Sequence, residues 1–339
     1  MLTYLNGPES DPFNYIYASK GWLSDYDPPR PFPFWINLEP TNHCQLNCLF
    51  CSRQKSQRAK GYLDLALAEA LFDEVAAQNA LRLPEVSATA VRFTGWGEPL
   101  LHPHIDKLCA LAKKRSIPLK LYTNGLNLSP ALMDQLIELE VDDLQFSMQG
   151  LNEKQYLFNR VGSDYRLLVH NIETISQKRG RLKKPFLSIL TSVLASELKS
   201  ARPDEFTERF LGLVDKVAID LTNLNFVSDL ERVKPHLGDQ SKGLRRGLCV
   251  DVFLALEVKY DGTIGFCGQD ADSLKEHTAG RFPQDRLKEA WLGRAMEAQR
   301  DKVGRNLGHD DSPVCRRCYH NTDKYDLFKQ NGAKNGGSR

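Results

Sequence analysis

The chain has 339 residues, of which 41% are hydrophobic and 26% are charged. Both values are close to those of ordinary globular proteins, so the composition excludes disordered and fibrous classes. The 45 Lys and Arg residues nearly balance the 43 Asp and Glu residues, and the net charge of +2 gives no general attraction for long nucleic acids or anionic membranes. We therefore expect neither a nucleic acid nor a membrane as a partner.

The first 33 residues are rich in proline and aromatic residues. The prolines around Pro28 and Pro31 prevent a regular helix, and aromatic residues such as Trp22 favour packing. We expect residues 1–33 to form an irregular N-terminal arm packed on the rest of the protein, with a disordered leader as the alternative. Residues 1–9 have neither the basic start nor the apolar stretch of a signal peptide, which predicts a cytoplasmic location.

Three of the eight cysteines, Cys44, Cys48 and Cys51, follow the first predicted strand, residues 34–39. In a reducing compartment such clustering indicates metal binding or catalysis rather than disulfides. A structural zinc site needs four ligands, and only His43 is close by in the sequence. Three thiolates could instead hold three irons of a [4Fe–4S] cluster and leave the fourth iron open to a small molecule.

The spacing Cys-x3-Cys-x-aromatic-Cys after an apolar strand resembles the signature of radical SAM enzymes, with Phe50 as the aromatic residue. The resemblance implies that the amino and carboxylate groups of S-adenosylmethionine (SAM) chelate the open iron. It also implies that the reduced cluster cleaves SAM to a 5′-deoxyadenosyl radical, which abstracts a hydrogen atom from a substrate. The chemistry would be carried by the cluster and SAM, so no catalytic side chain is predicted.

Segments after the next three predicted strands resemble further parts of this family. A Gly-Glu-Pro segment, which in the family receives the SAM ammonium, follows strand 89–94, although Trp96 stands where glycine is common. Strand 118–123 ends in a polar tip, and strand 143–148 ends where relatives contact the SAM ribose, many of them with Asp in place of Gln149. The resemblance implies SAM contacts from Phe50, Gly97, Glu98, Pro99, Thr123, Asn124, Ser147 and Gln149.

Strand-like and helix-like patterns alternate along the chain. Strands are predicted at 34–39, 89–94, 118–123, 143–148, 186–193 and 216–222, and helices at 62–79, 104–115, 129–139, 152–178 and 203–213. Repeated β–α units predict an α/β fold with a parallel sheet. Six units match the partial (β/α)6 TIM-like barrel that the resemblance implies, over residues 34–225. Cys109 lies on the apolar stripe of one helix, and we expect it to be buried.

The last third of the chain contains a second cysteine group, Cys249, Cys267, Cys315 and Cys318. The sequence predicts a hairpin over 258–267 with an Asp-Gly turn, followed by a helix over 285–302. Four cysteines could form a zinc site. The spacing also resembles SPASM and twitch extensions, in their shorter form with one auxiliary [4Fe–4S] cluster. We expect this domain at 226–325 as a small α+β unit, and a flexible tail at 326–339.

The resemblance implies two classes of substrate. Many relatives modify ribosomally made precursor peptides, and we expect this function first, with the auxiliary cluster assisting electron transfer. The alternative is a dehydrogenase of an aminocyclitol or sugar alcohol. A separate leader-peptide-binding protein and an electron donor such as flavodoxin or ferredoxin are the implied partners. A non-catalytic zinc-binding adaptor is a further alternative, which metal analysis would distinguish.

Overall fold

The computed structural model describes residues 29–81, 88–182, 184–194, 196–197, 202–222, 230–233, 235, 249, 251–272, 277–304 and 314–315. The predicted arm, apart from its last five residues, lies outside the described residues. So do the predicted tail and Cys318.

Six parallel strands form most of one nine-stranded sheet. These strands are β1 (Trp35–Leu38), β2 (Ala90–Phe93), β3 (Leu119–Thr123), β4 (Asp143–Gln149), β5 (Phe186–Val193) and β6 (Lys216–Leu221). The strands lie in the order β6-β5-β4-β3-β2-β1-β7-β8-β9, so β1 to β6 neighbour one another in chain order. The predicted α/β class and all six strands are confirmed.

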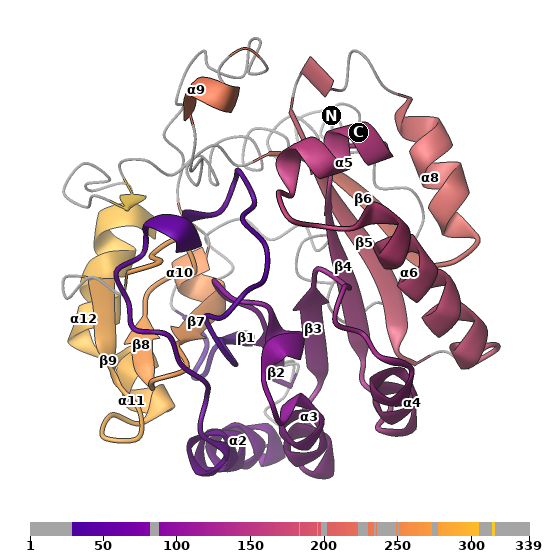
Figure 1. Cartoon of the computed structure of the whole chain (residues 1–339). Helices are drawn as coiled ribbons and strands as arrows, with labels where there is room; N and C mark the ends of the chain where they lie inside the picture. The colour runs from indigo at the N-terminus through magenta and orange to yellow at the C-terminus, as the bar shows by residue number, and fades with distance from the viewer. Residues whose placement is uncertain are drawn as a thin grey trace, which may run out of the picture.

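Helices cover the outside of this sheet (Figure 1). On the outside lie α2 (Leu65–Ala80), α3 (Ile105–Lys114), α4 (Pro130–Glu138), α6 (Tyr165–Arg179) and α8 (Pro203–Leu211), while α5 (Glu153–Asn159) lies at the carboxyl end of β4. Short polar side chains begin four of them: Asp64, Ser129, Asn152 and Asp164 each accept a backbone N–H of the first turn. Such caps satisfy N–H groups that have no partner within the helix.

The predicted single helix over 152–178 is wrong, because the chain leaves the helix between α5 and α6. Arg160 has φ −107° and ψ 74°, and Gly162 has φ 87°. A positive φ is readily adopted by glycine but strained for other residues. With Asp164 available as a second cap, two shorter helices replace one long helix.

The C-terminal elements continue the same sheet. They are α9 (Leu230–Val233), α10 (Asp251–Leu254), β7 (Ala255–Val258), β8 (Thr263–Gly265), β9 (Thr278–Arg281), α11 (Leu287–Leu292), α12 (Arg294–Gln299) and a last turn at Arg300–Gly304. Strand β7 pairs with β1 in parallel, and the predicted hairpin is formed by β7 and β8. The predicted helix over 285–302 breaks at Gly293, whose backbone is extended at φ −75° and ψ 163°.

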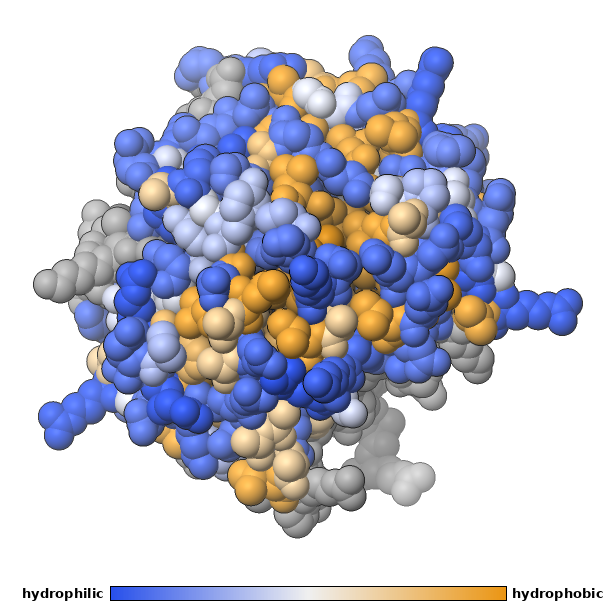
Figure 2. Space-filling model, turned by 60° about the horizontal axis from the view of Figure 1, so that its bottom comes forward, coloured by the Kyte–Doolittle hydropathy of each residue, from blue (hydrophilic) through white to orange (hydrophobic). Residues whose placement is uncertain are grey.

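The lower face of the molecule is mixed in character. Figure 2 shows hydrophilic residues over most of this face and hydrophobic residues in its middle. In the described parts of the chain, none of the helices combines the length and apolar character that a bilayer crossing requires.

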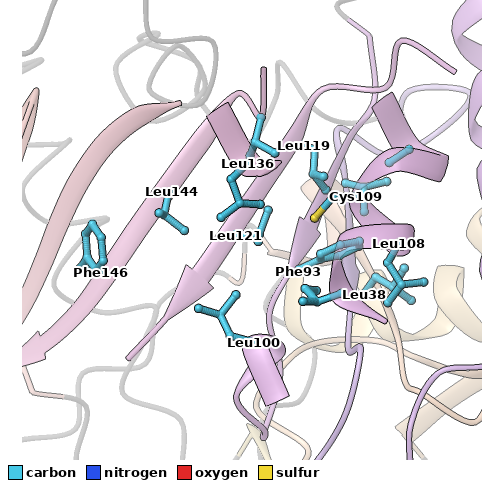
Figure 3. Close-up of a cluster of buried hydrophobic side chains, with 14 of the residues drawn as sticks. Leu38, Phe93, Leu100, Leu108, Cys109, Leu119, Leu121, Leu136, Leu144 and Phe146 are labelled. Atoms are coloured by element: carbon cyan, nitrogen blue, oxygen red, sulfur yellow. The ribbon is translucent and has the colours of Figure 1, made fainter. Parts of the chain in front are cut away.

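The core lies between the sheet and its helices. Because neighbouring strand residues point to opposite faces, one set of alternating side chains, including Leu38, Phe93 and Leu121, packs against the helices (Figure 3). Cys109 of α3 is fully buried in this core, as its position on an apolar stripe predicts.

The other set of alternating side chains defines the inner face of the sheet, opposite the helices. Many of these side chains are polar or charged. Asn37 of β1 is half-buried, and the following are buried: Glu39 just after β1, Arg92, Lys120, Asp143, Gln145, Gln149, Glu257 and Lys259. The carboxyl ends of β1 to β6 meet at one edge of this face, where α/β proteins usually bind ligands.

Candidate cofactor-binding site at the carboxyl ends of the strands

The three clustered cysteines lie on the loop between β1 and α2, drawn in indigo in Figure 1. None of the three forms a disulfide, and all three are half-buried. The loop is held by two backbone hydrogen bonds, from the Asn47 N–H to the Val161 carbonyl and from the Leu49 N–H to the Asn159 carbonyl, both 2.9 Å long. The acceptors lie at the break between α5 and α6, so this break supplies the support of the cysteine loop.

The thiols are close enough to influence one another. Burial raises the pKa of Cys44 to about 11, with smaller contributions from the charges of Glu98 and Cys48. Burial also raises the pKa of Cys51, and the charge of Cys48 adds to this effect. The protein alone therefore favours the protonated thiols, whereas bound metal cations favour thiolates.

The donor set fits an iron–sulfur cluster. Three thiols on one loop are the ligands that such clusters use, each binding a separate iron. Within the described residues, no three His, Cys, Asp or Glu side chains are gathered as a site for one metal ion. A structural zinc ion would need a fourth ligand, whereas three thiols suffice for a cluster that keeps one iron open.

Glu98 connects the loop after β2 to the tip of β3. Its buried carboxylate accepts hydrogen bonds from the Thr123 hydroxyl at 2.7 Å and the Asn124 N–H at 2.7 Å. It also accepts the Leu100 N–H at 3.1 Å, which caps the short helix Pro99–Leu101. Burial raises the pKa of Glu98, and these hydrogen bonds oppose the rise.

Gly97 lies against the start of the cysteine loop. A Cβ atom on Gly97 would be 2.0 Å from the Thr41 carbonyl oxygen, so no larger residue fits without movement of the backbone. The next residue, Glu98, donates its N–H to the His43 carbonyl at 2.7 Å. Glycine is therefore required because two backbone segments touch, and this contact sets the position of the loop beside Cys44.

Asn124 extends the network to the cysteine loop through Gln45. The Gln45 side-chain amide donates to the Asn124 oxygen at 3.2 Å and to the Asn127 oxygen at 2.6 Å. The structure therefore brings together the Gly97–Glu98 turn, the β3 tip and the cysteine loop, three of the segments predicted from the sequence.

The remaining predicted SAM contacts differ in their surroundings. Pro99 is the buried first residue of its short helix, and the Phe50 side chain packs in a hydrophobic cluster with Leu49 and Leu194. Ser147 and Gln149 share the inner face at the end of β4, where the Gln149 Oε1 atom is buried without a hydrogen-bond partner. Ser147 is half-buried.

A clamp that the sequence motifs do not indicate joins the cysteine loop to the C-terminal hairpin. Glu39 forms a two-fold ion pair with Arg58, at 2.6 and 3.2 Å, and accepts the Trp96 N–H at 3.1 Å. Arg58 lies over the ring of Tyr260, whose hydroxyl donates to the Ala59 carbonyl at 2.8 Å. These residues form the Glu39–Arg58–Tyr260 clamp. Because these residues lie far apart in the sequence, they form no motif from which the clamp could have been predicted.

Further contacts bring the residues after Cys51 close to the loop after Cys267. The Ser56 hydroxyl donates to the Ala271 carbonyl at 3.2 Å, and the Gln57 N–H donates to the Asp272 carboxylate at 3.0 Å. The first cysteine loop and part of the second cysteine group therefore lie in adjoining segments.

The second cysteine group is partly described. Cys315 packs against the apolar cluster of Cys249, Val252 and Phe253, and accepts a hydrogen bond from Gln299. Cys267 is half-buried beyond β8. Cys318 lies outside the described residues. An auxiliary cluster at these residues stays a prediction.

Together, the parallel sheet and the cysteine loop at its carboxyl edge define an α/β protein with a cofactor site of thiol ligands. Residues 38–191 match the family model of the radical SAM superfamily. The matched segment contains the cysteine loop, the Gly97–Glu98 turn and strands β2 to β4.

Two proteins of similar sequence match this chain over different lengths. The chain is 33% identical over 121 residues to the tungsten-containing aldehyde ferredoxin oxidoreductase cofactor-modifying protein of Pyrococcus furiosus; the match covers 36% of this chain and 32% of that protein. It is 26% identical over 320 residues to the PqqA peptide cyclase of Ruegeria pomeroyi, a match that covers 85% of this chain and 80% of the cyclase. The chain thus spans about a third of the first relative and most of the second.

Solved structures share the fold. BtrN in complex with AdoMet and 2-DOIA has a TM-score of 0.57 at 16% identity, covering 86% of this chain and 94% of BtrN. Streptococcus suis SuiB bound to its precursor peptide SuiA has a TM-score of 0.59 at 13% identity, covering 84% of this chain and 69% of SuiB. These similarities confirm the predicted partial barrel fold.

Proposed function

We propose that this protein binds SAM at the carboxyl edge of the sheet and uses it to remove a hydrogen atom from a peptide substrate. The observation that carries the proposal is the placement of three clustered cysteines on one loop beside the network of Glu98, Thr123 and Asn124. When bound, a [4Fe–4S] cluster and SAM would supply reductive cleavage of SAM and a radical able to abstract hydrogen.

The protein's own residues would bind and orient these groups. Cys44, Cys48 and Cys51 would hold the cluster. Gly97 keeps the backbone before Glu98 close to the cysteine loop, and Glu98 fixes the β3 tip. The Glu98 Oε2 atom accepts one hydrogen bond within the protein, so it retains capacity for a second donor such as the SAM ammonium.

A peptide substrate is supported by two comparisons. The PqqA peptide cyclase matches over most of both chains, and SuiB, which shares the fold, binds a precursor peptide. A separate leader-binding protein and an external electron donor belong to this proposal. The alternative, a dehydrogenase of an aminocyclitol or sugar alcohol, is supported by the fold shared with BtrN, whose complex holds AdoMet and 2-DOIA.

We further propose an auxiliary [4Fe–4S] cluster on Cys249, Cys267, Cys315 and Cys318. The packing of Cys315 against the apolar side chains around Cys249 supports this set of ligands. Iron analysis after anaerobic reconstitution should give about eight irons per chain, and about four in a Cys315→Ala/Cys318→Ala variant. A zinc content of about one per chain that this double substitution removes would assign these residues to zinc instead.

SAM binding tests the proposal for the first site. The reconstituted protein should bind SAM, and Cys48→Ala should lose both this binding and about four irons. Cys109→Ala is the matched control because this cysteine lies in the core under α3 and should leave both unchanged. Equal SAM binding by Cys48→Ala and the unaltered protein would contradict the proposal.

A further inference from the structure

Arg92 is a buried cation on the inner face of the sheet. It lies in β2 between Val91 and Phe93, which point to the opposite face and join the hydrophobic core. Its side chain is 7% exposed. The strand register places it beside Asn37 of β1 and Lys120 of β3, so it faces the interior that β1 to β6 partly enclose.

This arginine has no anionic partner. Its guanidinium forms no ion pair or hydrogen bond with any described residue, and its Nε atom is buried without a partner. Its carbon Cζ lies 3.4 Å from the centre of the Trp35 ring, and the charge of Lys120 opposes it. Burial of an unpaired charge is costly, and stacking on one ring leaves the in-plane N–H donors unused.

Two other cations of this interior have carboxylate partners. Lys120 pairs with Asp143 at 2.5 Å, and Arg58 pairs with Glu39 at 2.6 Å. The charge of Lys259 acts on Glu39 and on Glu257, but among the described residues its Nζ atom forms no ion pair and is buried without a hydrogen-bond partner. Arg92 and Lys259 therefore both lack a directly bonded anion among the described residues, and positive charge is in excess on this face.

Unused hydrogen-bonding atoms on the same face lead from the level of Arg92 to the carboxyl edge. Asn37 Oδ1 lies on the neighbouring strand at the level of Arg92. Gln145 Nε2 lies one step higher on β4, and Gln149 Oε1 lies at the end of that strand. All three atoms are buried without partners. Such groups are normally paired, so their clustering indicates a polar ligand.

We propose that Arg92 binds a carboxylate of the substrate, and this assignment rests on the proposed function. A planar guanidinium donates two parallel N–H groups to a carboxylate. The excess of positive charge on this face favours an anionic ligand, and inorganic phosphate is the competing anion that the test must separate from a carboxylate. An ammonium group would be repelled by Arg92. The substrate is thus an acidic residue of a peptide rather than an aminocyclitol.

Thermal unfolding of the reconstituted protein tests this site without turnover, because a ligand that binds the folded state raises the unfolding midpoint. The probe is N-acetyl-glutamate N-methylamide at tens of millimolar, whose single charge is the side-chain carboxylate. The midpoint should rise by a few degrees with this probe, and not with the neutral glutamine analogue. Arg92→Gln should abolish the rise, while Arg166→Gln, which removes an exposed arginine, should retain it.

Several results would overturn the assignment. These are no rise with the glutamate probe, an equal rise in Arg92→Gln, or an equal rise with the glutamine analogue or with inorganic phosphate. If Arg92→Gln does not fold, Arg92→Lys keeps the charge without the planar fork and should respond to the probe several-fold more weakly; an equal response would overturn the assignment. SAM binding, measured separately, distinguishes the two proposals: its absence contradicts the proposed function, while the Arg92-dependent midpoint tests the carboxylate site alone.

Discussion

At the scale of single residues, the site depends on contacts that leave no room for change. Gly97 touches the backbone of Thr41, and Glu98 accepts three hydrogen bonds from two neighbouring segments. The sequence motif indicated both residues as SAM contacts. The structure gives them a further role, because they set the distance between the cysteine loop and the β3 tip.

Gly97→Ala should destabilise the protein by about 1–3 kcal/mol, since a methyl group at 2.0 Å from the Thr41 oxygen forces a backbone shift. Thermal unfolding of the reconstituted variant should show the loss. Gly212→Ala is the matched control, because nothing lies within 4 Å of its Cβ position. Equal midpoints for the two variants would show that the close contact is absent in solution.

Glu257 gives stability a pH dependence. Burial raises the pKa of Glu257 in the folded protein, so folding favours its protonated form. The stability that this preference contributes is lost as pH rises from the unfolded pKa, about 4.3, through the folded pKa. Glu257→Gln mimics the protonated form and keeps the acceptor for the Asn37 amide. The free energy of unfolding of Glu257→Gln, minus that of the unaltered protein, should therefore increase as pH rises. Denaturant unfolding between pH 5 and pH 8 measures this difference; a difference that falls with pH would contradict it.

At the scale of elements, the Glu39–Arg58–Tyr260 clamp fixes the segment after the cysteine loop. Its carboxylate–guanidinium pair is buried, and its tyrosine comes from the turn between β7 and β8. The cysteine loop is thus supported by the C-terminal hairpin as well as by the α5–α6 break.

Tyr260→Phe should loosen this segment, because it removes the hydrogen bond to the Ala59 carbonyl, worth about 0.5–1.5 kcal/mol, and keeps the ring beneath Arg58. Hydrogen exchange of the backbone amides at 56–62 should become faster. Tyr62→Phe is the control, since the hydroxyl of that half-exposed tyrosine has no hydrogen bond to a described residue and its ring contacts His43 and His102. Faster exchange in both variants, or in neither, would contradict the clamp.

The elements also show what the sequence could predict. The strands and most helices were predicted correctly because their hydrophobic patterns match the sheet and helix periods. The breaks at Gly162 and Gly293 were missed because each lies inside a longer pattern that remains compatible with helix. The clustered site residues were predictable from their motifs, whereas the clamp and Arg92 depend on pairings between distant segments.

At the scale of the whole molecule, the strands next to both cysteine groups belong to one sheet. Strand β7 adds to β1 on the side opposite β2, so the C-terminal hairpin extends the sheet of the segment that matches the radical SAM family. Unfolding of the hairpin should therefore expose the edge of β1 and weaken the first site as well.

The central claim is that Cys44, Cys48 and Cys51 form a cluster site at which SAM is cleaved. The most direct measurement is 5′-deoxyadenosine formation after anaerobic reconstitution, with dithionite and SAM added. The account predicts deoxyadenosine from the unaltered protein and none from Cys48→Ala. Absence of deoxyadenosine from an unaltered protein with its full iron content would contradict the account.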